Sequence, residues 1–416
     1  MSFAHATAAQ QESPGFSRGE DVKSSWRCLR HVILGPCLSL CLTLSTVADA
    51  GGTTARKSNR ATPLKATAAR DEGAMVPVTY GQRDDVLRYG AELAESLGLD
   101  PAWVQSKLGK ARFQPAVVKL IMPPPAGTAK NWAAYRARFV ESRRIRAGLD
   151  FWRANERWLR SAEERYGVPP EIVVGIVGVE TMYGQQMGNF RAIDALATLA
   201  FDFPAGRKDR SAFFRDELSQ LFVFCHAGAP RPTPADGAEP RGDNTVAAPE
   251  PCDPLALRSS FAGALGMPQF MPSSVNRYAI DFDGDGRIDL RYGAADVIGS
   301  VARYLAEFGW QRGMPTRFEV AVPVDAADRA ALLVPDIVPS FSAAQFAAQG
   351  ARLSPAGQDH AGLLALVELQ NGDAAPSYIA GTANFYAVTR YNWSSYYALA
   401  VIELGEAVKE QFSAAR

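Results

Sequence analysis

One carboxylate, Glu180, ends an otherwise apolar run in the segment PPEIVVGIVGVETMYGQQMG, residues 169–188. The two prolines suit the first turn of a helix, where a missing N–H costs no hydrogen bond. An ionised carboxylate in apolar surroundings is costly, so we predict a raised pKa for Glu180. A carboxylic acid that keeps its proton near neutral pH can serve as general acid in cleavage of a glycosidic bond. The alternative is a partly buried Glu in an ion pair with an arginine such as Arg191.

A second group of carboxylates, DFDGDGRID at residues 281–289, follows the opening of an EF-hand calcium loop. Acidic residues alternate there, and Gly286 permits the sharp turn that lets them converge on one hard cation. The twelfth position departs from the pattern, because it holds Tyr292 instead of a bidentate Glu. The alternative is an acidic turn that binds nothing. The expected ligands are four carboxylates and one backbone carbonyl, from Asp281, Asp283, Asp285, Asp296 and Arg287.

Two further segments combine polar groups with small or aromatic residues. In GALGMPQFMPSS, residues 263–274, the side-chain amide of Gln269 could donate a hydrogen bond to a sugar. The alternative is a buried Gln that bonds to the backbone. Ser260, just before this segment, has the same two interpretations. In NFYAVTRYNWSSYYALA, residues 384–400, the tyrosines cannot all enter a core without partners for their hydroxyls. These rings could form a carbohydrate groove, and the alternative is a set of amphipathic core tyrosines.

Composition excludes several classes of function. The 416 residues carry 44 basic and 44 acidic side chains, and this balance argues against nucleic-acid binding, which normally requires a basic excess. The sequence holds no H-E-x-x-H motif, no G-x-S-x-G elbow and no phosphate-binding loop. An uncharged polymer such as a glycan remains a suitable substrate.

The N-terminal region has the features of a secretory signal. Basic residues precede the apolar stretch VILGPCLSLCLTLSTV, and Ala48-Asp49-Ala50 follows it. The apolar stretch is too short to span a membrane. Leu40 stands where a lipoprotein signal needs a small residue before Cys41, which favours a soluble exported protein over a lipid-anchored one. Residues 51–75 then form a polar linker.

Two of the five cysteines, Cys225 and Cys252, lie outside the signal region. They flank a tract rich in Pro and Gly with few apolar residues. In an exported protein this pattern predicts a disulfide at the base of the tract, and two free thiols are the alternative.

Apolar spacing predicts a mainly α chain with a minor β part. Three- and four-residue spacings indicate helices over most of 86–224, 294–310 and 394–412. The segments RFEVAVPV and GLLALVELQ, between residues 314 and 370, alternate or are rich in β-branched residues, which favours strands.

Six motifs in one order resemble those of the B-type lytic murein transglycosylases, a glycoside hydrolase family (family 103) with a lysozyme-like core. They are GVETMYG, DALATLAFDFP, SSFAGALGMPQFMPSS, DFDGDGRIDL, IGSVARYL and NFYAVTRYN with a tyrosine after four more residues. The resemblance covers about residues 80–412. It implies a periplasmic enzyme that cleaves the β-1,4 bond between N-acetylmuramic acid and N-acetylglucosamine and leaves 1,6-anhydromuramic acid ends.

The resemblance also assigns residues. Glu180 would be the single catalytic acid and base, and Tyr397 is expected beside it. The glycan groove is expected to include Tyr135, Ser260, Gln269, Tyr304, Tyr391, Asn392 and Tyr397. The metal would be a structural Ca²⁺, with one extra residue before Asp296 relative to the family pattern, and catalysis would need no cofactor. The paired arginines of the family correspond only loosely to Arg207 and Lys208.

The expected class is mainly α (α+β), a lysozyme-like core with an additional helical domain and a small β-containing insertion. The expected parts are a signal peptide (1–50), a linker (51–75), a helical domain (76–165, with the C-terminal helix 394–412), a catalytic core (166–312, with the loop 281–296), a β-containing domain (313–376) and a return to the core (377–416). We expect a monomer that acts on peptidoglycan strands, binds no nucleic acid, and has other murein enzymes and the outer membrane as candidate contacts. The alternatives are a hydrolytic muramidase and a non-catalytic, calcium-stabilised murein-binding protein.

Overall fold

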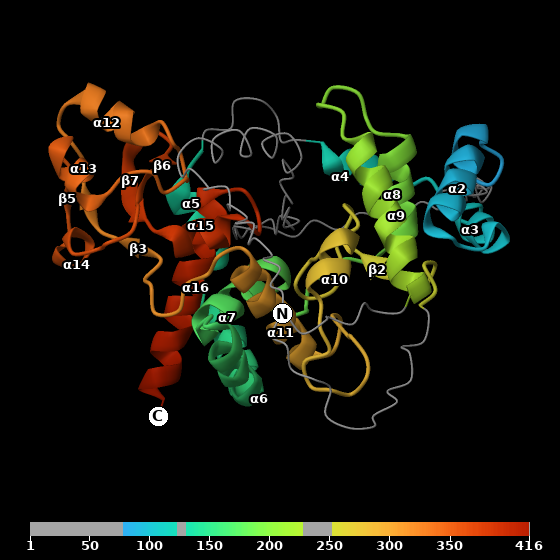
Figure 1. The fold of residues 1–416 in the computed structure, drawn as a ribbon, viewed down its shortest axis with the longest axis horizontal. Coiled ribbons are helices and arrows are strands. Elements are labelled where there is room, and N and C mark those ends of the chain that lie inside the picture. The colour runs from blue at the N-terminus through green and yellow to red at the C-terminus, as the bar shows by residue number, and fades with distance from the viewer. Residues whose placement is uncertain (1–77, 123–129, 228–251, 416) are drawn as a thin grey trace, which may run out of the picture. The chain divides into compact units, whose positions relative to one another are not determined.

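The computed structural model describes residues 78–122, 130–227 and 252–415, so the predicted signal peptide and linker lie outside the described residues. The predicted mainly helical class is confirmed, and the strands are short (Figure 1). The first helices are α2 (Asp84–Leu97), α3 (Pro101–Leu108), α4 (Pro115–Ile121), α5 (Trp132–Phe139), α6 (Ser142–Tyr166), α7 (Pro170–Thr181), α8 (Ala192–Phe201) and α9 (Ser211–Ala227). The later ones are α10 (Pro272–Tyr278), α11 (Ala294–Glu307), α15 (Ala383–Thr389) and α16 (Ser395–Ala414).

Helices α7 and α16 form the centre of the core, and glycines let them touch. A Cβ atom at Gly175 would lie 2.1 Å from the carbonyl oxygen of Val401, and one at Gly405 would lie 2.0 Å from that of Glu171. Any side chain at either position would therefore push the helices apart. Helix α6 packs on both α7 and α16, and α11 packs on α6 and α7. The two glycines thus place the N-terminal half of α16 against the helix that carries Glu180.

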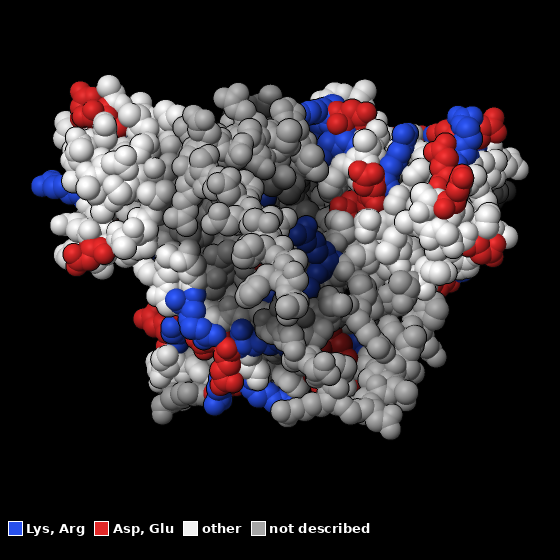
Figure 2. Space-filling view, viewed as in Figure 1, with Lys and Arg blue, Asp and Glu red and all other residues white. Residues whose placement is uncertain are grey.

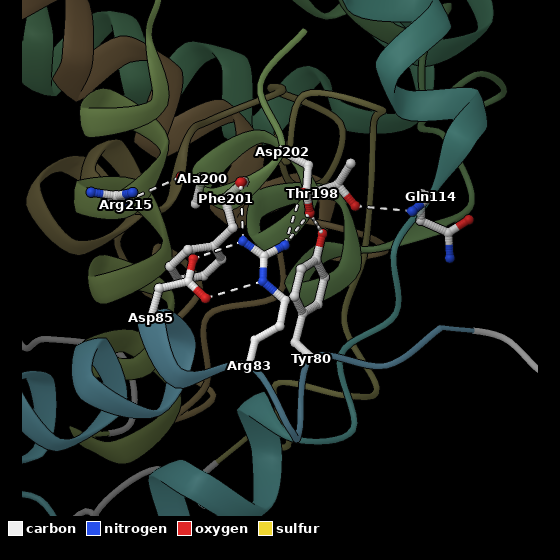
Figure 3. Close-up of polar contacts among 9 residues, drawn as sticks. All are labelled: Tyr80, Arg83, Asp85, Gln114, Thr198, Ala200, Phe201, Asp202 and Arg215. Atoms are coloured by element: carbon white, nitrogen blue, oxygen red, sulfur yellow. Dashed lines mark hydrogen bonds and ion pairs between the residues drawn. The ribbon is translucent and has the colours of Figure 1, made fainter.

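A polar cluster ties the beginning of α2 to the end of α8 (Figure 3). The Arg83 guanidinium donates to both carboxylate oxygens of Asp202, at 2.8 Å each, and to Asp85. The buried hydroxyl of Tyr80 donates to Asp202 at 2.6 Å. A single carboxylate therefore receives three charge-assisted or buried hydrogen bonds, which are among the stronger kinds.

The region expected as one helical domain, residues 76–165, has two packing environments. Helices α2 and α3 pack on each other, and α4 packs on α8, which in turn packs on α9. Helix α6 instead joins the core formed by α7, α11 and α16. The apolar spacing of these helices was identified correctly, but spacing along one helix does not tell which neighbour its apolar face meets.

The β-containing part builds a small core of its own. Its strands are β3 (Arg317–Phe318), β4 (Val320–Ala321), β5 (Arg352–Leu353), β6 (Ala365–Asn371) and β7 (Ala374–Gly381), with α12 (Ala326–Leu333), α13 (Ala343–Ala348) and α14 (Pro355–Gln358) between them. The antiparallel order β3–β7–β6 pairs Val367 with Ile379, and β4 pairs with β5. The buried side chains of Leu332, Phe346, Leu353, Leu364 and Leu366 form a cluster separate from the main core.

Two details of this part differ from the sequence expectation. The segment RFEVAVPV is not one strand, because it breaks at Glu319 and its halves pair with different partners, β7 and β5. Strand β7 lies beyond the two segments that predict strands, and it reaches Gly381. Its sequence shows no β-branched pattern, because Pro376 and three alanines interrupt it.

The surface carries both signs of charge. Figure 2 shows basic and acidic side chains side by side on the face that it presents, over the region of α2 and α4. This distribution agrees with the equal numbers of basic and acidic residues in the sequence.

A disulfide joins Cys225, near the end of α9, to Cys252, with the two Cα atoms 4.4 Å apart. Cys225 is fully buried in the main core. The residues between 228 and 251 lie outside the described part of the chain. The bond therefore closes the ends of this tract onto the helix that packs against α8.

We predict that reduction of this disulfide lowers stability without removing activity. Closing a loop of this length contributes about 3 kcal/mol, chiefly by restricting the unfolded chain. Denaturant titration of the wild type and of the double variant Cys225→Ser/Cys252→Ser measures the loss. Non-reducing peptide mapping of the purified wild type provides the check, since two free thiols there would contradict the bond.

Candidate active site

Glu180 lies in the last turn of α7, a helix whose residues are buried on every side from Ile172 onward. Its side chain is only 9% exposed. The helix ends directly afterwards because Met182 and Tyr183 adopt left-handed backbone angles, with φ of 50° and 56°. The hydroxyl of Thr181 secures this end by donating to the carbonyl of Met267 and accepting from the N–H of Gly184.

Tyr397 supplies the hydrogen bond to the buried carboxylate. Its hydroxyl donates to Oε1 of Glu180 at 2.7 Å, and its side chain is fully buried. The pKa of Tyr397 lies well above its usual value, because burial and then the nearby Glu180 carboxylate both disfavour the phenolate. The phenol therefore keeps its proton and stays a donor to Glu180.

The alternative ion pair between Glu180 and Arg191 is wrong. The guanidinium of Arg191 donates instead to both carboxylate oxygens of the buried Asp194, at 2.7 and 2.8 Å. Arg191 and Asp194 are three residues apart at the start of α8, so this ion pair forms within one turn of the chain.

The other predicted tyrosines gather around Tyr397. The ring of Tyr391 stacks on that of Tyr397, with centroids 6.2 Å apart, and Tyr304 lies against Tyr391 at 4.9 Å. The hydroxyl of Tyr391 donates to the carbonyl of Pro268, and that of Tyr304 to the carbonyl of Arg390. These hydroxyls are thus held by backbone, and Asn392, next in the chain, is buried.

Tyr135 reaches the same neighbourhood from α5. Its ring meets that of Tyr396 edge to face at 5.9 Å, and it is close enough to raise the pKa of Tyr397 slightly further. A cavity of about 540 Å³ opens here, lined by Tyr135, Tyr396 and Trp393 among others. An aromatic-walled cavity therefore adjoins the first turn of the helix that carries Tyr397.

Gln269 and Ser260 bond to backbone in this structure. Gln269 has a left-handed φ of 51°, and its side-chain amide donates to the carbonyl of Gly266 at 2.8 Å. The hydroxyl of Ser260 accepts from the backbone N–H of Ala264 at 3.1 Å. The backbone bond expected in the alternative for Gln269 is present, but the residue is only partly buried. Contact of Gln269 or Ser260 with a glycan stays a prediction.

The acidic loop brings three of the predicted metal ligands together. Asp281, Asp283 and Asp296 each present a carboxylate oxygen, and these oxygens lie within 4.8 Å of one another. Asp296 comes from the first turn of α11, so the fold brings it into the loop despite the extra residue. Such a set of converging oxygens is the kind that calcium prefers. Burial, followed by the charges of Asp283 and Asp281, raises the pKa of Asp296 to about 6.

The remaining members of the loop have local roles. Asp285 accepts from the backbone N–H of Arg287 at 2.8 Å. Asp289 accepts from the N–H groups of Arg291 and Tyr292, which shapes the exit of the loop. Tyr292, which stands where the EF-hand pattern has its Glu, is 74% exposed.

Sequence reasoning missed one residue next to the active-site helix. Arg144 of α6 is buried and donates to the carbonyl of Gly178, on the helix that carries Glu180. Its sequence context, SRRIR, reads as a solvated basic face, so no local signal distinguished it from its neighbours.

Comparison with known proteins identifies the class. The family described as transglycosylase SLT domain matches residues 82–406. The membrane-bound lytic murein transglycosylase B of Escherichia coli (strain K12) is 37% identical over 320 residues, which cover 75% of this chain and 79% of that protein.

Solved structures agree with this match. The soluble lytic transglycosylase SltB1 from Pseudomonas aeruginosa has 33% identity and a TM-score of 0.67, covering 79% of this chain and 99% of that one. The Escherichia coli lytic transglycosylase Slt35 in complex with calcium has 32% identity and a TM-score of 0.65, covering 83% and 100%.

The family match and these structures define the class, a mainly helical, lysozyme-like lytic transglycosylase, and the predicted fold is confirmed. This chain belongs to the SLT-domain transglycosylase family, with the B-type lytic murein transglycosylases as its relatives. Among the described residues, no helix combines the length and the apolar character that a membrane span requires.

We predict that Glu180 and Tyr397 are energetically coupled. A double-mutant cycle of Glu180→Gln and Tyr397→Phe, measured by denaturant unfolding, should give a coupling of about 0.5–3 kcal/mol, as for buried residues that share a hydrogen bond. The control cycle replaces Tyr397→Phe with Tyr80→Phe, whose buried hydroxyl donates to Asp202. Equal coupling in both cycles would contradict a specific bond between Tyr397 and Glu180.

Proposed function

We propose that Glu180 is the general acid and base with which this lytic murein transglycosylase cleaves the β-1,4 bond between N-acetylmuramic acid and N-acetylglucosamine. The observation that carries this proposal is the buried carboxylate with a neutral phenol at 2.7 Å. In such surroundings the ionised form is costly, so the carboxylic acid can hold the proton that the leaving oxygen needs.

Glu180 gives one proton and takes up another, so it ends the reaction protonated as it began. The acid first protonates the glycosidic oxygen while the bond from that oxygen to C1 of muramic acid breaks. The resulting carboxylate then takes the proton of the 6-hydroxyl of the same sugar, whose oxygen forms a bond to C1. The product carries a 1,6-anhydro ring and no water is consumed. Tyr397 holds one oxygen of the carboxylate in place during both transfers.

The tyrosines near Tyr397 suit the binding of a sugar strand. The hydroxyls of Tyr304 and Tyr391 donate to backbone carbonyls, so what they can offer to sugars is their rings and the acceptor side of each hydroxyl. Lys130 and Arg138 also line the cavity at Tyr135. SltB3 from Pseudomonas aeruginosa, 28% identical with a TM-score of 0.63, has been solved in complex with NAG-NAM-pentapeptide. We propose that Ser260, Gln269 and Asn392 complete the groove.

We predict that Glu180→Gln stops the release of soluble muropeptides from sacculi. Gln keeps the shape of the side chain but cannot transfer a proton, and the loss of a general acid typically costs about 10²–10⁴-fold in rate. Glu171→Gln is the matched control, because it makes the same change on the same helix at a residue paired with Lys409. A Glu180→Gln variant with the wild-type rate would refute the role of Glu180, provided that circular dichroism shows both variants folded.

The proposed metal is a structural Ca²⁺ in the loop at 281–296. The convergence of Asp281, Asp283 and Asp296 supports it, and Asp285 with the carbonyl of Arg287 would complete the set. A cation there would offset the repulsion between the carboxylates and hold the start of α11 against the loop. The reaction itself is assigned to side chains of the chain and needs no cofactor.

We predict that Ca²⁺ raises the melting temperature of protein first stripped of metal. An ion bound only by the folded state at 100 times its Kd stabilises by about 2.7 kcal/mol. Asp283→Asn should remove the response, whereas Asp216→Asn, at an exposed position on α9, should retain it. Wild-type protein that melts at one temperature with and without added Ca²⁺ would show the loop to be a turn only.

We also propose that the enzyme is exported to the periplasm. Peptidoglycan lies there, and a disulfide such as Cys225–Cys252 persists in an oxidising compartment. Association with the outer membrane, the monomeric state and contacts with other murein enzymes stay predictions, as do the domain boundaries.

A further inference from the structure

Arg144 is a buried charge without a carboxylate. It is 5% exposed, and none of the ion pairs among the described residues includes it. The nearby carboxylate of Glu141 accepts from the backbone N–H groups of Arg143 and Arg144, as the cap of α6. Burying a guanidinium is costly, and no carboxylate of the described residues pairs with it to offset that cost. A neutral residue would suit a purely structural role better.

What Arg144 does contact is the end of the catalytic helix. Its Nη1 donates to the carbonyl of Gly178, which also accepts from the N–H of Met182 at 3.1 Å. The guanidinium carbon lies 5.3 Å from the centre of the Phe139 ring. The last carbonyls of a helix lack partners within it and form the negative end of its dipole, so a cation is favourable at this position.

The turn that follows Gly178, and whose Met182 N–H bonds the same carbonyl as Arg144, is strained. Met182 and Tyr183 are two successive residues other than glycine with left-handed φ angles, directly after Thr181. Such conformations persist only where the surrounding structure holds them, and they cluster at functional sites. Glu180 lies at the near edge of this turn, so any relaxation of Met182 and Tyr183 would move its carboxylate.

Tyr183 is held by the same helix that supplies Arg144. Its hydroxyl lies in a slot between Gly148 of α6 and Gly178 of α7, where added Cβ atoms would come within 2.3 and 2.5 Å of it. Within the described part of the chain, this hydroxyl and Nε of Arg144 are both buried without a hydrogen-bond partner. Polar groups left unpaired in a core are costly, which indicates that something other than stability retains them.

We propose that Arg144 is a positioning residue for the reaction at Glu180. By holding the carbonyl of Gly178 and the strained turn at Met182 and Tyr183, it fixes the last turn of α7 and so directs the carboxylate toward Tyr397. This inference rests on the proposed function of Glu180, because it concerns the geometry of that proton transfer. Arg144 does not touch the reacting atoms.

The test separates positioning from stability by a kinetic split. Purified Arg144→Met and Arg144→Lys are assayed on soluble glycan oligomers well below their melting temperatures. We expect kcat of Arg144→Met to fall by about 10- to 100-fold, as for small misplacements of a catalytic group, with KM changed by less than about threefold. Lysine keeps the charge and can donate to a carbonyl, so Arg144→Lys should recover much of the loss. If Arg144→Met does not fold, the kcat of Arg144→Lys still tests the positioning role.

Two controls lie on the same helix. Arg153→Met makes the same chemical change at an exposed position, and Leu159→Ala removes buried core contacts. Both should keep kcat near the wild-type value. Hydrogen exchange of the Met182 and Tyr183 amides should become faster in Arg144→Met and stay unchanged in Leu159→Ala under conditions of equal stability.

The outcomes distinguish this inference from the proposed function. A wild-type kcat in Arg144→Met, or a decrease in kcat no larger than that of Leu159→Ala, would overturn the positioning role. The proposed function would still stand in that case if Glu180→Gln is inactive. An active Glu180→Gln in the same assay would overturn both.

Discussion

The contact between α7 and α16 is the constraint on which the active site depends. Gly175 and Gly405 bring the two backbones together, because neither position has space for a Cβ. That approach places Tyr397, in the first turn of α16, at hydrogen-bond distance from Glu180, in the last turn of α7. Glu180 is buried there, and its hydrogen-bond donor is a phenol that keeps its proton. The packing of two helices thus brings the carboxylate and the phenol together, which is the arrangement that the proposed proton transfer uses.

The rest of the fold holds these two helices. Helix α6 packs on both and supplies Arg144 and Gly148 to the end of α7. Helix α11 connects the same core to the acidic loop through Asp296, whose carboxylate accepts from the N–H groups of Phe282 and Asp289. Two buried charged residues, Glu180 and Arg144, and the strained turn at Met182 and Tyr183 lie at the end of α7. Functional sites often carry such local costs, and the large apolar core offsets them here.

The sequence predicted what short-range patterns encode. The helix beginning at Pro170, the carboxylate at the end of its apolar run and the converging acidic loop follow from proline, apolar and alternating-acid patterns. What it could not predict depends on neighbours far along the chain. The burial of Arg144 depended on α7 lying across it. The pair between Arg191 and Asp194 is local by contrast, and it was missed because Asp194 was not considered as a partner. The break of the strand at Glu319 likewise arises from two competing pairing partners, β7 and β5, which no local pattern reveals.

The fate of water tests the account most directly. If Glu180 accepts the proton of the 6-hydroxyl and the oxygen of that hydroxyl attacks C1, cleavage consumes no water. Digestion of sacculi in H₂¹⁸O, followed by mass spectrometry of the muropeptides, should therefore give ends that are 1,6-anhydro and free of ¹⁸O. Reducing ends that carry ¹⁸O would contradict the account and indicate a hydrolytic muramidase. Sacculi left intact by the folded enzyme would indicate a protein that binds murein without cleaving it.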